Sequence, residues 1–570
     1  MKIHFVRAGL VLCAVLCVAA CNDTNTPPAP PPVPPTVPSP PAPVPPAPAP
    51  VMTPKSIRLV EKQRFLTGKY DLGAAEIPAY DPASKRLFVV NGADKTVDVF
   101  QVGDLNAAPA AKIGTLDLTT LGAAANSVSV KKGIVAVAVE AAPKTNPGRV
   151  GLFRASDLAL LGSAEVGALP DMLTFTADGN TVLVANEGEP TSYGQADSVD
   201  PEGSVSLVNV SNPAAPTVRT AGFASFNDAA ATLRSRGVRL FGTNASVAQD
   251  VEPEYIAISP DGASAMVSLQ EANAFAKLDI ASATITAILP LGLKNHNAAG
   301  NRFDPSDRDT SVNNGINISN WLVFGMYMPD TIASYATGGK TYYVTANEGD
   351  ARDYTGLAEE LRVGAAGYVL DATVFPNAST LKNNANLGRL TVSARTGDTD
   401  GDGDFDQIHV FGARSFSIFD DAGTLVFDSA DDFERRIASL SSTVRFNAGS
   451  TTNAQDDRSD NKGIEPEALA VFSLGAKTFA TIGLERQGGL FTYDITAPTA
   501  PVFVEYVTNR KFMAADLKAN VETGGASDGD LAPEGIVFVP AVDSPSGVPL
   551  LIVASETSGS TTIYEVEQQF

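Results

Sequence analysis

The chain has 570 residues, of which 44% are hydrophobic, and a formal net charge of −23. A chain of this size can bury one large core or two ordinary ones, and its acidity favours metal cations or cationic partners over nucleic acid, whose phosphates it would repel. Only His296 and His409 lie beyond the N-terminal segment, so zinc sites and Ser-His-Asp catalysis are disfavoured.

The first 20 residues have the pattern of a lipoprotein signal peptide. Lys2 and Arg7 precede an apolar run, which ends in the four residues Val-Ala-Ala-Cys at Cys21. This ending resembles the lipobox of bacterial lipoproteins, in which cleavage before the cysteine leaves it diacylated. We therefore expect a lipid on Cys21 that anchors the chain in the cell envelope, and Asn22 favours the outer membrane. The alternative is an ordinary secretory signal with a chance cysteine.

Residues 21–55 form a linker in which the stretch from Pro27 to Pro50 is almost entirely Pro, Ala and Val. Such a stretch adopts polyproline II at about 3.1 Å per residue, so it could hold the following domain roughly 70 Å from the membrane. We expect a spacer here and a single folded domain over residues 56–570.

From residue 56 onward a unit of three short apolar runs, separated by turn residues, recurs about seven times. Clear copies begin at Pro253-Glu254, Pro466-Glu467 and Pro533-Glu534, and fainter ones near Glu76, Asn126, Asp171 and Asp330. Repeats of this kind are typical of a β-propeller. The sequence therefore predicts an all-β fold, a seven-bladed propeller with long loop insertions, in which residues 56–65 complete the last blade and close the ring.

Inserted segments interrupt the repeat. Residues 223–240 and 355–363 have the periodicity of short amphipathic helices, and larger insertions occupy residues 291–321 and 352–407. Because long loops are more often functional than idle, we expect the larger insertions to contribute to a site.

Acidic residues recur at two places in each unit. If the first strand of a unit pairs with the second through a tight turn, the start of the first and the end of the second share one face of the propeller. This places five acids near the central axis: Asp171, Glu254, Asp330, Glu467 and Glu534. Behind them stand Asn91, Glu140, Asn186, Glu187, Glu271, Asn347, Glu348, Glu485 and Glu556, and Asp350 is a further candidate for the rim. Such a ring implies bound cations, shifted protonation or a basic ligand. The alternative is that each Pro-Glu step only caps a strand entrance.

A second acidic motif lies inside the later insertion. It has the form D-x-D-x-D-G-x-x-D, with Gly403 at the sharp turn and these candidate ligands: Asp398, Asp400, Asp402, Asp404 and Asp406. Alternate carboxylates converge on one hard cation in this pattern, as in the first nine positions of an EF-hand loop. His409 stands at the twelfth position, so the motif is closer to the shorter calcium loops of integrin-type propellers. We predict bound Ca²⁺; the alternative is a solvated acidic turn.

Several long motifs resemble the choice-of-anchor I proteins, which are related to the mesenchyme-specific cell surface glycoproteins of animals. They lie at residues 186–190, 325–330, 345–354, 398–418 and 463–469, and the resemblance covers most of residues 57–566. It implies a surface protein, since members attach by varied anchors. Many members resemble or are fused to phosphatase and nucleotidase modules, but no such module accompanies this chain.

Two functions are compatible with these features. The favoured hypothesis is a calcium-stabilised, membrane-anchored and monomeric propeller that binds an unknown surface ligand. The alternative is a calcium-dependent phosphoesterase that acts on a phosphorylated small molecule, as β-propeller phytases do. In that scheme rim carboxylates hold the metal ions, while three arginines clamp the phosphate oxygens: Arg352, Arg414 and Arg486.

Overall fold

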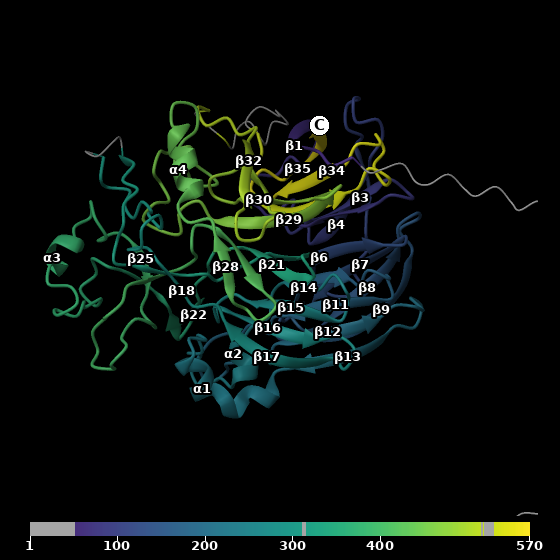
Figure 1. The fold of residues 1–570 in the computed structure, drawn as a ribbon. Helices are drawn as coiled ribbons and strands as arrows, with labels where there is room; N and C mark the ends of the chain where they lie inside the picture. Colours follow the sequence, from purple (N-terminus) through teal and green to yellow (C-terminus); the bar gives the residue numbers. More distant parts are fainter. Residues whose placement is uncertain (1–51, 311–314, 515–516, 518–528) are drawn as a thin grey trace, which may run out of the picture. The chain divides into compact units, whose positions relative to one another are not determined.

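A computed structural model describes residues 52–310, 315–514, 517 and 529–570 (Figure 1). The predicted signal peptide, the predicted lipidation site at Cys21 and most of the proline-rich linker lie outside the described residues. In the part of the chain that is described, no helix has both the length and the hydrophobicity that crossing a bilayer requires.

The described residues form seven four-stranded antiparallel sheets, which are the blades of a propeller. In chain order the first four are β2–β5 (Pro78–Asp81, Arg86–Asn91, Thr96–Gln101, Lys112–Thr115), β6–β9 (Ala124–Lys131, Ile134–Glu140, Pro147–Arg154, Leu160–Ala168), β10–β13 (Pro170–Phe175, Thr181–Asn186, Ser204–Asn209, Thr217–Gly222) and β14–β17 (Ile256–Ile258, Ser264–Leu269, Ala274–Asp279, Thr284–Pro290). The others are β20, β21, β27 and β28 (Ile332–Thr337, Lys340–Ala346, Phe416–Asp420, Leu425–Asp428), β29–β32 (Pro466–Leu474, Lys477–Leu484, Leu490–Asp494, Val502–Val507) and β33–β35 with β1 (Pro533–Val539, Leu550–Ser555, Ser560–Gln569, Ser56–Leu66).

The first strands of the blades form a closed ring. Each of β2, β6, β10, β14, β20, β29 and β33 contacts the corresponding strand of the next blade, and β33 contacts β2. Strand β1 pairs antiparallel with β35, from Ser56 opposite Gln569 to Leu66 opposite Ser560, and lies beside it in Figure 1. The predictions of seven blades and of closure by the N-terminal strand are therefore confirmed.

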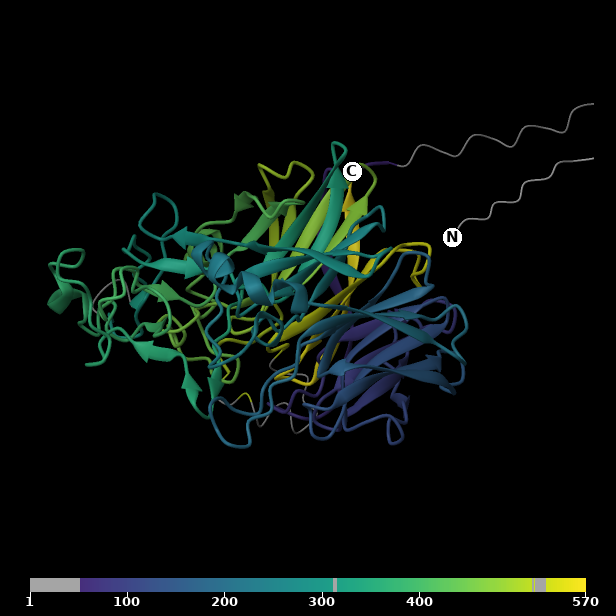
Figure 2. The same cartoon turned by 90° about the horizontal axis from the view of Figure 1, so that it is seen from below.

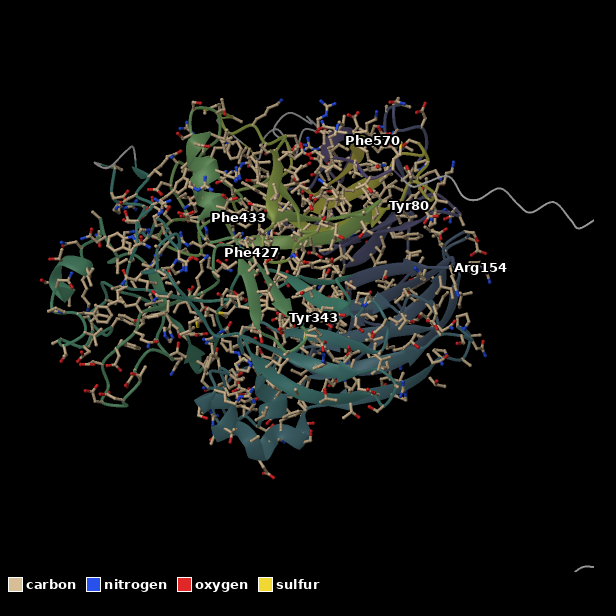
Figure 3. All side chains as sticks on the ribbon, viewed as in Figure 1. Tyr80, Arg154, Tyr343, Phe427, Phe433 and Phe570 are labelled. Carbon is tan, nitrogen blue, oxygen red and sulfur yellow. The ribbon has the colours of Figure 1, made fainter. Side chains whose placement is uncertain are left out.

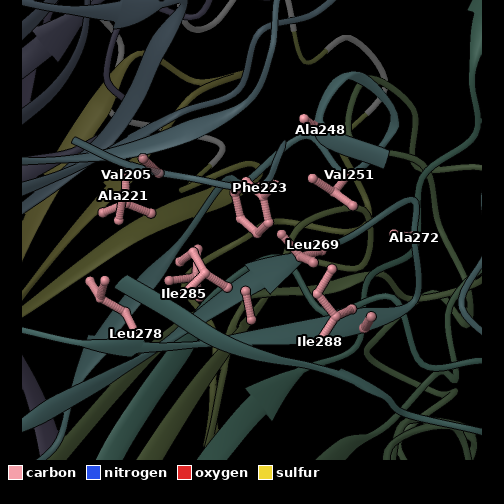
Figure 4. Packing of buried hydrophobic residues seen from close by; sticks show 14 of the residues in the cluster. Val205, Ala221, Phe223, Ala248, Val251, Leu269, Ala272, Leu278, Ile285 and Ile288 are labelled. Carbon is pink, nitrogen blue, oxygen red and sulfur yellow. The ribbon is translucent and has the colours of Figure 1, made fainter. Parts of the chain in front are cut away.

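The hydrophobic core lies between neighbouring blades. In one cluster Val205 and Ala221 of the third blade face Leu269 and Ile288 of the fourth, and Phe223 packs among them (Figure 4). Burial of a side chain of this size contributes about 1.5–3 kcal/mol, so the contacts between blades hold the ring together.

The segment between the third and fourth blades contains the helix predicted there. A 3₁₀ helix, η1 (Ala224–Ala229), continues into α1 (Ala230–Ser235), and α2 (Val247–Asp250) follows with a capping box at Ser246. The helix predicted over residues 355–363 is wrong. Strand β22 (Asp353–Tyr354) pairs there with β23 (Leu357–Ala358), and β24 (Glu360–Arg362) pairs with β25 (Thr391–Ser393). Gly356 turns the short hairpin with a φ of 93°, which is incompatible with a helix.

The two large predicted insertions lie outside the blades and pack against each other. Strands β18 (Leu293–Asn295) and β19 (Phe324–Met326) form a sheet with β26 (His409–Val410), and α3 (Ala378–Leu381) belongs to the second insertion. Figure 2 shows these segments gathered at one side of the blades.

A third insertion, residues 429–465, was not anticipated from the sequence. It carries α4 (Asp432–Ser439), which docks through Phe433: the ring centroid lies 4.9 Å from that of Phe491 and 6.0 Å from that of Phe416 (Figure 3).

Candidate functional site

The strand register confirms the geometry that gathers the acidic residues. Pro170 pairs with Asn186, Pro466 with Leu484 and Pro533 with Ser555, so the start of each first strand lies beside the end of the second. The acids that follow these positions share one face. We call this group the channel mouth; its members are Asp171, Glu187, Glu254, Glu271, Asp330, Glu348, Glu467, Glu485, Glu534 and Glu556. Asp350 lies at its exposed margin, 3.8 Å from Lys462 Nζ.

First strands from several blades line a cavity of about 410 Å³. Glu76, Asp171, Asp330 and Glu534 come from four different blades and all contribute to its wall, together with Tyr255. Four carboxyl groups therefore line one partly open cavity at the centre of the ring.

A residue with a left-handed backbone precedes a proline at the entrance to five of these first strands. The residues are Leu169, Glu252, Met328, Glu465 and Ala532, with φ values of 47°, 38°, 41°, 51° and 59°. Such conformations are costly for residues other than glycine and persist where the surroundings impose them. The recurrence of this turn shows that the chain enters these blades in the same way and places the acid after each proline at an equivalent position.

Cations neutralise one side of the channel mouth. Lys462 Nζ lies 2.6 Å from Glu348 Oε1 and 3.1 Å from Glu465 Oε2, and Arg486 lies 2.7 Å from Glu485 Oε1 and 3.3 Å from Glu465 Oε2. Burial opposes ionisation of Glu465, but the charges of Lys462, Arg458 and Arg486 outweigh it and lower its pKa to about 2. This side is a network of close ion pairs centred on Glu465, although burial still raises the pKa values of Glu348 and Glu485.

Carboxyl groups outnumber cations on the other side. Burial, reinforced by Glu556 and Asp171, raises the pKa of Glu76 to about 8, and burial next to Glu271 raises that of Asp171 to about 7. Burial and neighbouring carboxylates also raise the pKa well above its ordinary value in Glu187, Glu254, Asp330, Glu467 and Glu534. These shifts have the direction that a ring of like charges predicts.

Several buried oxygens on this side lack a hydrogen-bond donor among the described residues. They are Oε2 of Glu254, Glu271 and Glu467, and Oε2 of Glu485 at the boundary with the paired side. Burial of a carboxylate oxygen without a hydrogen-bond partner destabilises the fold. A proton, a water molecule or a cation at these atoms would relieve that cost.

Two groups of three carboxylates at the channel mouth have oxygens that all lie within 4.8 Å of one another, and both groups include Glu348. One adds Asp330 and Glu467, and the other adds Glu465 and Glu485. This spacing is about twice the Ca–O distance of about 2.4 Å, so either set could share one ion. Lys462 and Arg486 already neutralise the second set, which leaves the first as the stronger candidate.

The predicted calcium loop also brings its carboxylates together. Oxygens of Asp398, Asp400 and Asp406 lie within 4.8 Å of one another, as do those of Asp404, Asp406 and Asp371. Asp402 belongs to neither group and accepts a hydrogen bond from the Asp404 N–H at 3.1 Å. The two groups share Asp406, so the loop could hold one ion or a close pair.

Backbone and side-chain groups within this loop donate hydrogen bonds to its carboxylates. The N–H groups of Gly401 and Gly403 donate to Asp398 at 2.7 and 3.1 Å, and Thr399 Oγ1 donates to Asp406 at 2.6 Å. Gly403 has a φ of 102°, which agrees with the sharp turn expected there.

The three candidate phosphate-binding arginines have different surroundings. Arg352 is buried, pairs with the Asp250 carboxylate and lies 3.1 Å from Glu252 Oε2. Arg414 is buried and lies 2.7 Å from Glu434 Oε1. Arg486 keeps 30% of its side chain exposed, so it is the one of the three that is open to a ligand.

The asparagines predicted behind the rim stabilise the blades. Asn186 Nδ2 donates to Ser206 Oγ at 2.9 Å, and Asn347 Nδ2 donates to Ser417 Oγ at 2.8 Å. Asn91 Nδ2 donates to Asp98 at 3.0 Å, whereas Glu140 ends β7 half-buried. Each of the three amides joins the second strand of its blade to the third.

Sequence analysis missed Lys462, Glu465, Glu252 and Asp371. A signal for two of them exists, because Glu-Pro-Glu occurs at residues 252–254 and again at 465–467. In both copies the first Glu pairs with a cation, the buried Arg352 or the partly buried Lys462, and the second joins the channel mouth. Asp371 lies 27 residues before Asp398, so no local motif includes it.

Comparison with known proteins identifies the family. Residues 76–498 match the family described as the choice-of-anchor I domain, which spans most of the chain. The chain belongs to the choice-of-anchor I family. Membership indicates that this choice-of-anchor I propeller is a cell-surface protein.

One curated relative is Gigasin-3a of Magallana gigas, which is 28% identical over 192 residues; the match covers 33% of this chain and 67% of the relative. Among solved structures, Kuenenia stuttgartiensis hydrazine synthase is 12% identical with a TM-score of 0.41, covering 88% of this chain and 99% of that one. The Cps50 (Swd1) β-propeller domain of Myceliophteria thermophila is 9% identical with a TM-score of 0.41, covering 89% and 100%. At these scores the structural likenesses carry no functional argument, and the fold rests on the strand pairing itself.

The raised pKa of Glu76 predicts a dependence of stability on pH. The unfolded chain releases this proton near the ordinary value of 4.5, whereas the folded chain keeps it up to about 8. Between these values the folded chain binds more protons, so its stability falls as pH rises. We expect the melting temperature of the metal-free chain to fall between about pH 5 and about pH 8. In Glu76→Gln, which needs no proton, this fall should be smaller.

The matched control is Glu202→Gln, at an exposed residue. Calorimetry across this pH range should give the control the same slope as the unchanged chain. An equal slope in Glu76→Gln would show that Glu76 titrates normally in the folded state.

Proposed function

We propose that this choice-of-anchor I propeller is a calcium-stabilised binding module, held at the cell envelope by a lipid on Cys21. The observation that carries the proposal is the convergence of carboxylates in the loop over residues 398–406, where two groups share Asp406. Oxygen ligands in this number suit Ca²⁺.

The loop lies in the insertion that leaves the second strand of its blade beside Glu348 and returns at β27. Leu370 and Phe405 form a β-bridge within it, so an ion at the loop would fix the segment from residue 370 to residue 406. A site that binds the folded chain and not the unfolded one stabilises the fold. Calcium would thereby order one wall around the channel mouth.

The binding role is supported by the position of the insertions. The long insertions that return at Glu254, Asp330, Phe416 and Glu465 join the blades on the side of the acidic residues, so they extend the surface around the channel mouth. Carboxyl groups without cation partners suit a ligand with cationic groups or one bridged by a metal ion. The proline-rich linker would hold this face away from the membrane. We propose that this membrane is the outer membrane.

A metal-dependent phosphoesterase is the second candidate, and one observation favours it. Arg486 is partly exposed beside carboxylates that could hold an ion, which is the arrangement that phosphate binding to a metal site needs. Arg352 and Arg414 are occupied by buried partners, which makes this candidate the weaker one.

Removal of calcium should lower the melting temperature of the full-length chain. A ligand at a hundred times its dissociation constant contributes about 2.7 kcal/mol to the free energy of unfolding. Asp400→Asn should copy most of the effect of a chelator, and a chelator should then have little further effect on that variant. Calorimetry with calcium and with chelator makes the comparison.

The control Asp197→Asn, at an exposed site, should behave as the unchanged chain. Equal melting of all forms with and without chelator would contradict the calcium proposal.

Assays of phosphate release separate the two candidate functions. Full-length chain, with calcium or with chelator, is offered phytate, nucleoside monophosphates and a chromogenic phosphate ester. If the chain is a binding module, these assays should detect no calcium-dependent release of phosphate. Calcium-dependent turnover that Arg486→Lys reduces, and Glu202→Gln does not, would favour the phosphoesterase instead.

A further inference from the structure

Three carboxylates at the channel mouth converge although they are distant in the chain. Asp330 precedes β20, Glu348 follows β21 of the same blade, and Glu467 lies in β29 of the next blade. One oxygen from each lies within 4.8 Å of the other two. None of these residues belongs to the loop over residues 398–406, so the group is independent of the calcium site proposed above.

Glu467 provides a second observation that points to a ligand. Its side chain is in the core of the channel mouth, with the whole residue only 9% exposed. Its Oε2 has no hydrogen-bond donor among the described residues. An unpaired carboxylate oxygen at this depth carries a desolvation cost that a cation would offset.

Neighbouring side chains orient the other two carboxylates. Gln270 Nε2 donates to Glu348 Oε2 at 3.0 Å, and Lys462 Nζ donates to Glu348 Oε1 at 2.6 Å. Thr331 Oγ1 donates to Asp330 Oδ2 at 3.2 Å. Contacts of this kind hold ligand carboxylates in place around metal ions.

Charge at this position favours a divalent ion. Lys462 is shared among Glu348, Glu465 and Asp350, and no ion pair to Asp330 or Glu467 occurs among the described residues. Glu534 adds a further carboxyl group in the wall of the same cavity as Asp330. One ion of charge +2 would offset the negative charge that Lys462 leaves uncompensated.

The cavity beside Asp330 gives the ion a route and further ligands. Its volume of about 410 Å³ has room for several water molecules. Calcium takes six to eight oxygen ligands, and three carboxylates supply only part of them. Asp330 lines this cavity, so a carboxylate or phosphate oxygen of a molecule bound there could replace water on the ion.

We propose that Asp330, Glu348 and Glu467 bind a hard divalent cation of the calcium type at the mouth of the propeller channel. The ion holds neighbouring blades together at the axis and presents open coordination positions to the cavity. It is a second site, distinct from the loop over residues 398–406.

Calcium binding by the full-length chain tests the proposal. Isothermal titration with Ca²⁺ is carried out on the unchanged chain, on Glu467→Gln and on Asp400→Asn, with Glu202→Gln as the control. Glutamine keeps the shape of Glu467 and removes its charge. We expect Glu467→Gln to lose one binding event, or to weaken it by about tenfold or more, while the event that depends on Asp400 persists.

The variants separate failure of this site from failure of the loop site. Identical titrations of Glu467→Gln and the unchanged chain would overturn the channel-mouth site, and an unaltered titration of Asp400→Asn would overturn the loop site. Asp330→Asn provides a second test of the channel mouth should Glu467→Gln not fold, and the same loss is expected. Retention of every binding event in folded Asp330→Asn would count against the proposal.

Discussion

Crowding of carboxyl groups at the centre of the ring is the constraint on which the rest of the structure depends. Like charges in a poorly solvated space raise one another's pKa and cannot all ionise without countercharge. Glu76, Asp171, Asp330 and Glu534 share one cavity, and Glu467 leaves a buried oxygen unpaired. Protons, fixed side-chain cations or bound metal ions must therefore balance the negative charge of these groups.

The propeller produces this crowding through its own repetition. The first strand of each blade lies at the axis, and the second strand ends on the face where the first begins. An acid at either of these two positions is therefore repeated around the ring. The two Glu-Pro-Glu segments show how the chain manages part of the charge. The first Glu of each pairs with a cation, Arg352 or Lys462, and the second remains at the channel mouth. Compensation is thus local and incomplete, which leaves the side around Glu254 and Glu467 available for a ligand.

Much of the fold was predictable because the repeat is visible in the sequence. Alternating apolar runs and turn residues identified the first strand of each blade, and the same pattern placed the acids on one face. The insertions were harder to predict, since their conformation depends on contacts between distant segments. Residues 355–363 have a helical periodicity, yet pairing of β24 with β25 and the turn at Gly356 make them strands.

The site was predictable only in part for the same reason. Spacing along the chain revealed the carboxylates of the loop, but Asp371 joins them through the fold. The sequence likewise gave no indication that Lys462 pairs with Glu348, which lies 114 residues earlier in the chain. Arg352 and Arg414 stand in polar motifs that suggested anion binding, and their burial against Asp250 and Glu434 could not be read from those motifs.

A cell-surface propeller with metal ions at its loop and at its axis would combine a rigid scaffold with an adaptable binding face. The most direct test of this account is a crystal structure of the protein grown with calcium, with diffraction data collected at a wavelength where calcium scatters anomalously. The account predicts an anomalous peak bounded by Asp330, Glu348 and Glu467, besides one at the loop of Asp398, Asp400 and Asp406. Water or no density between the three channel-mouth carboxylates, at saturating calcium, would contradict it.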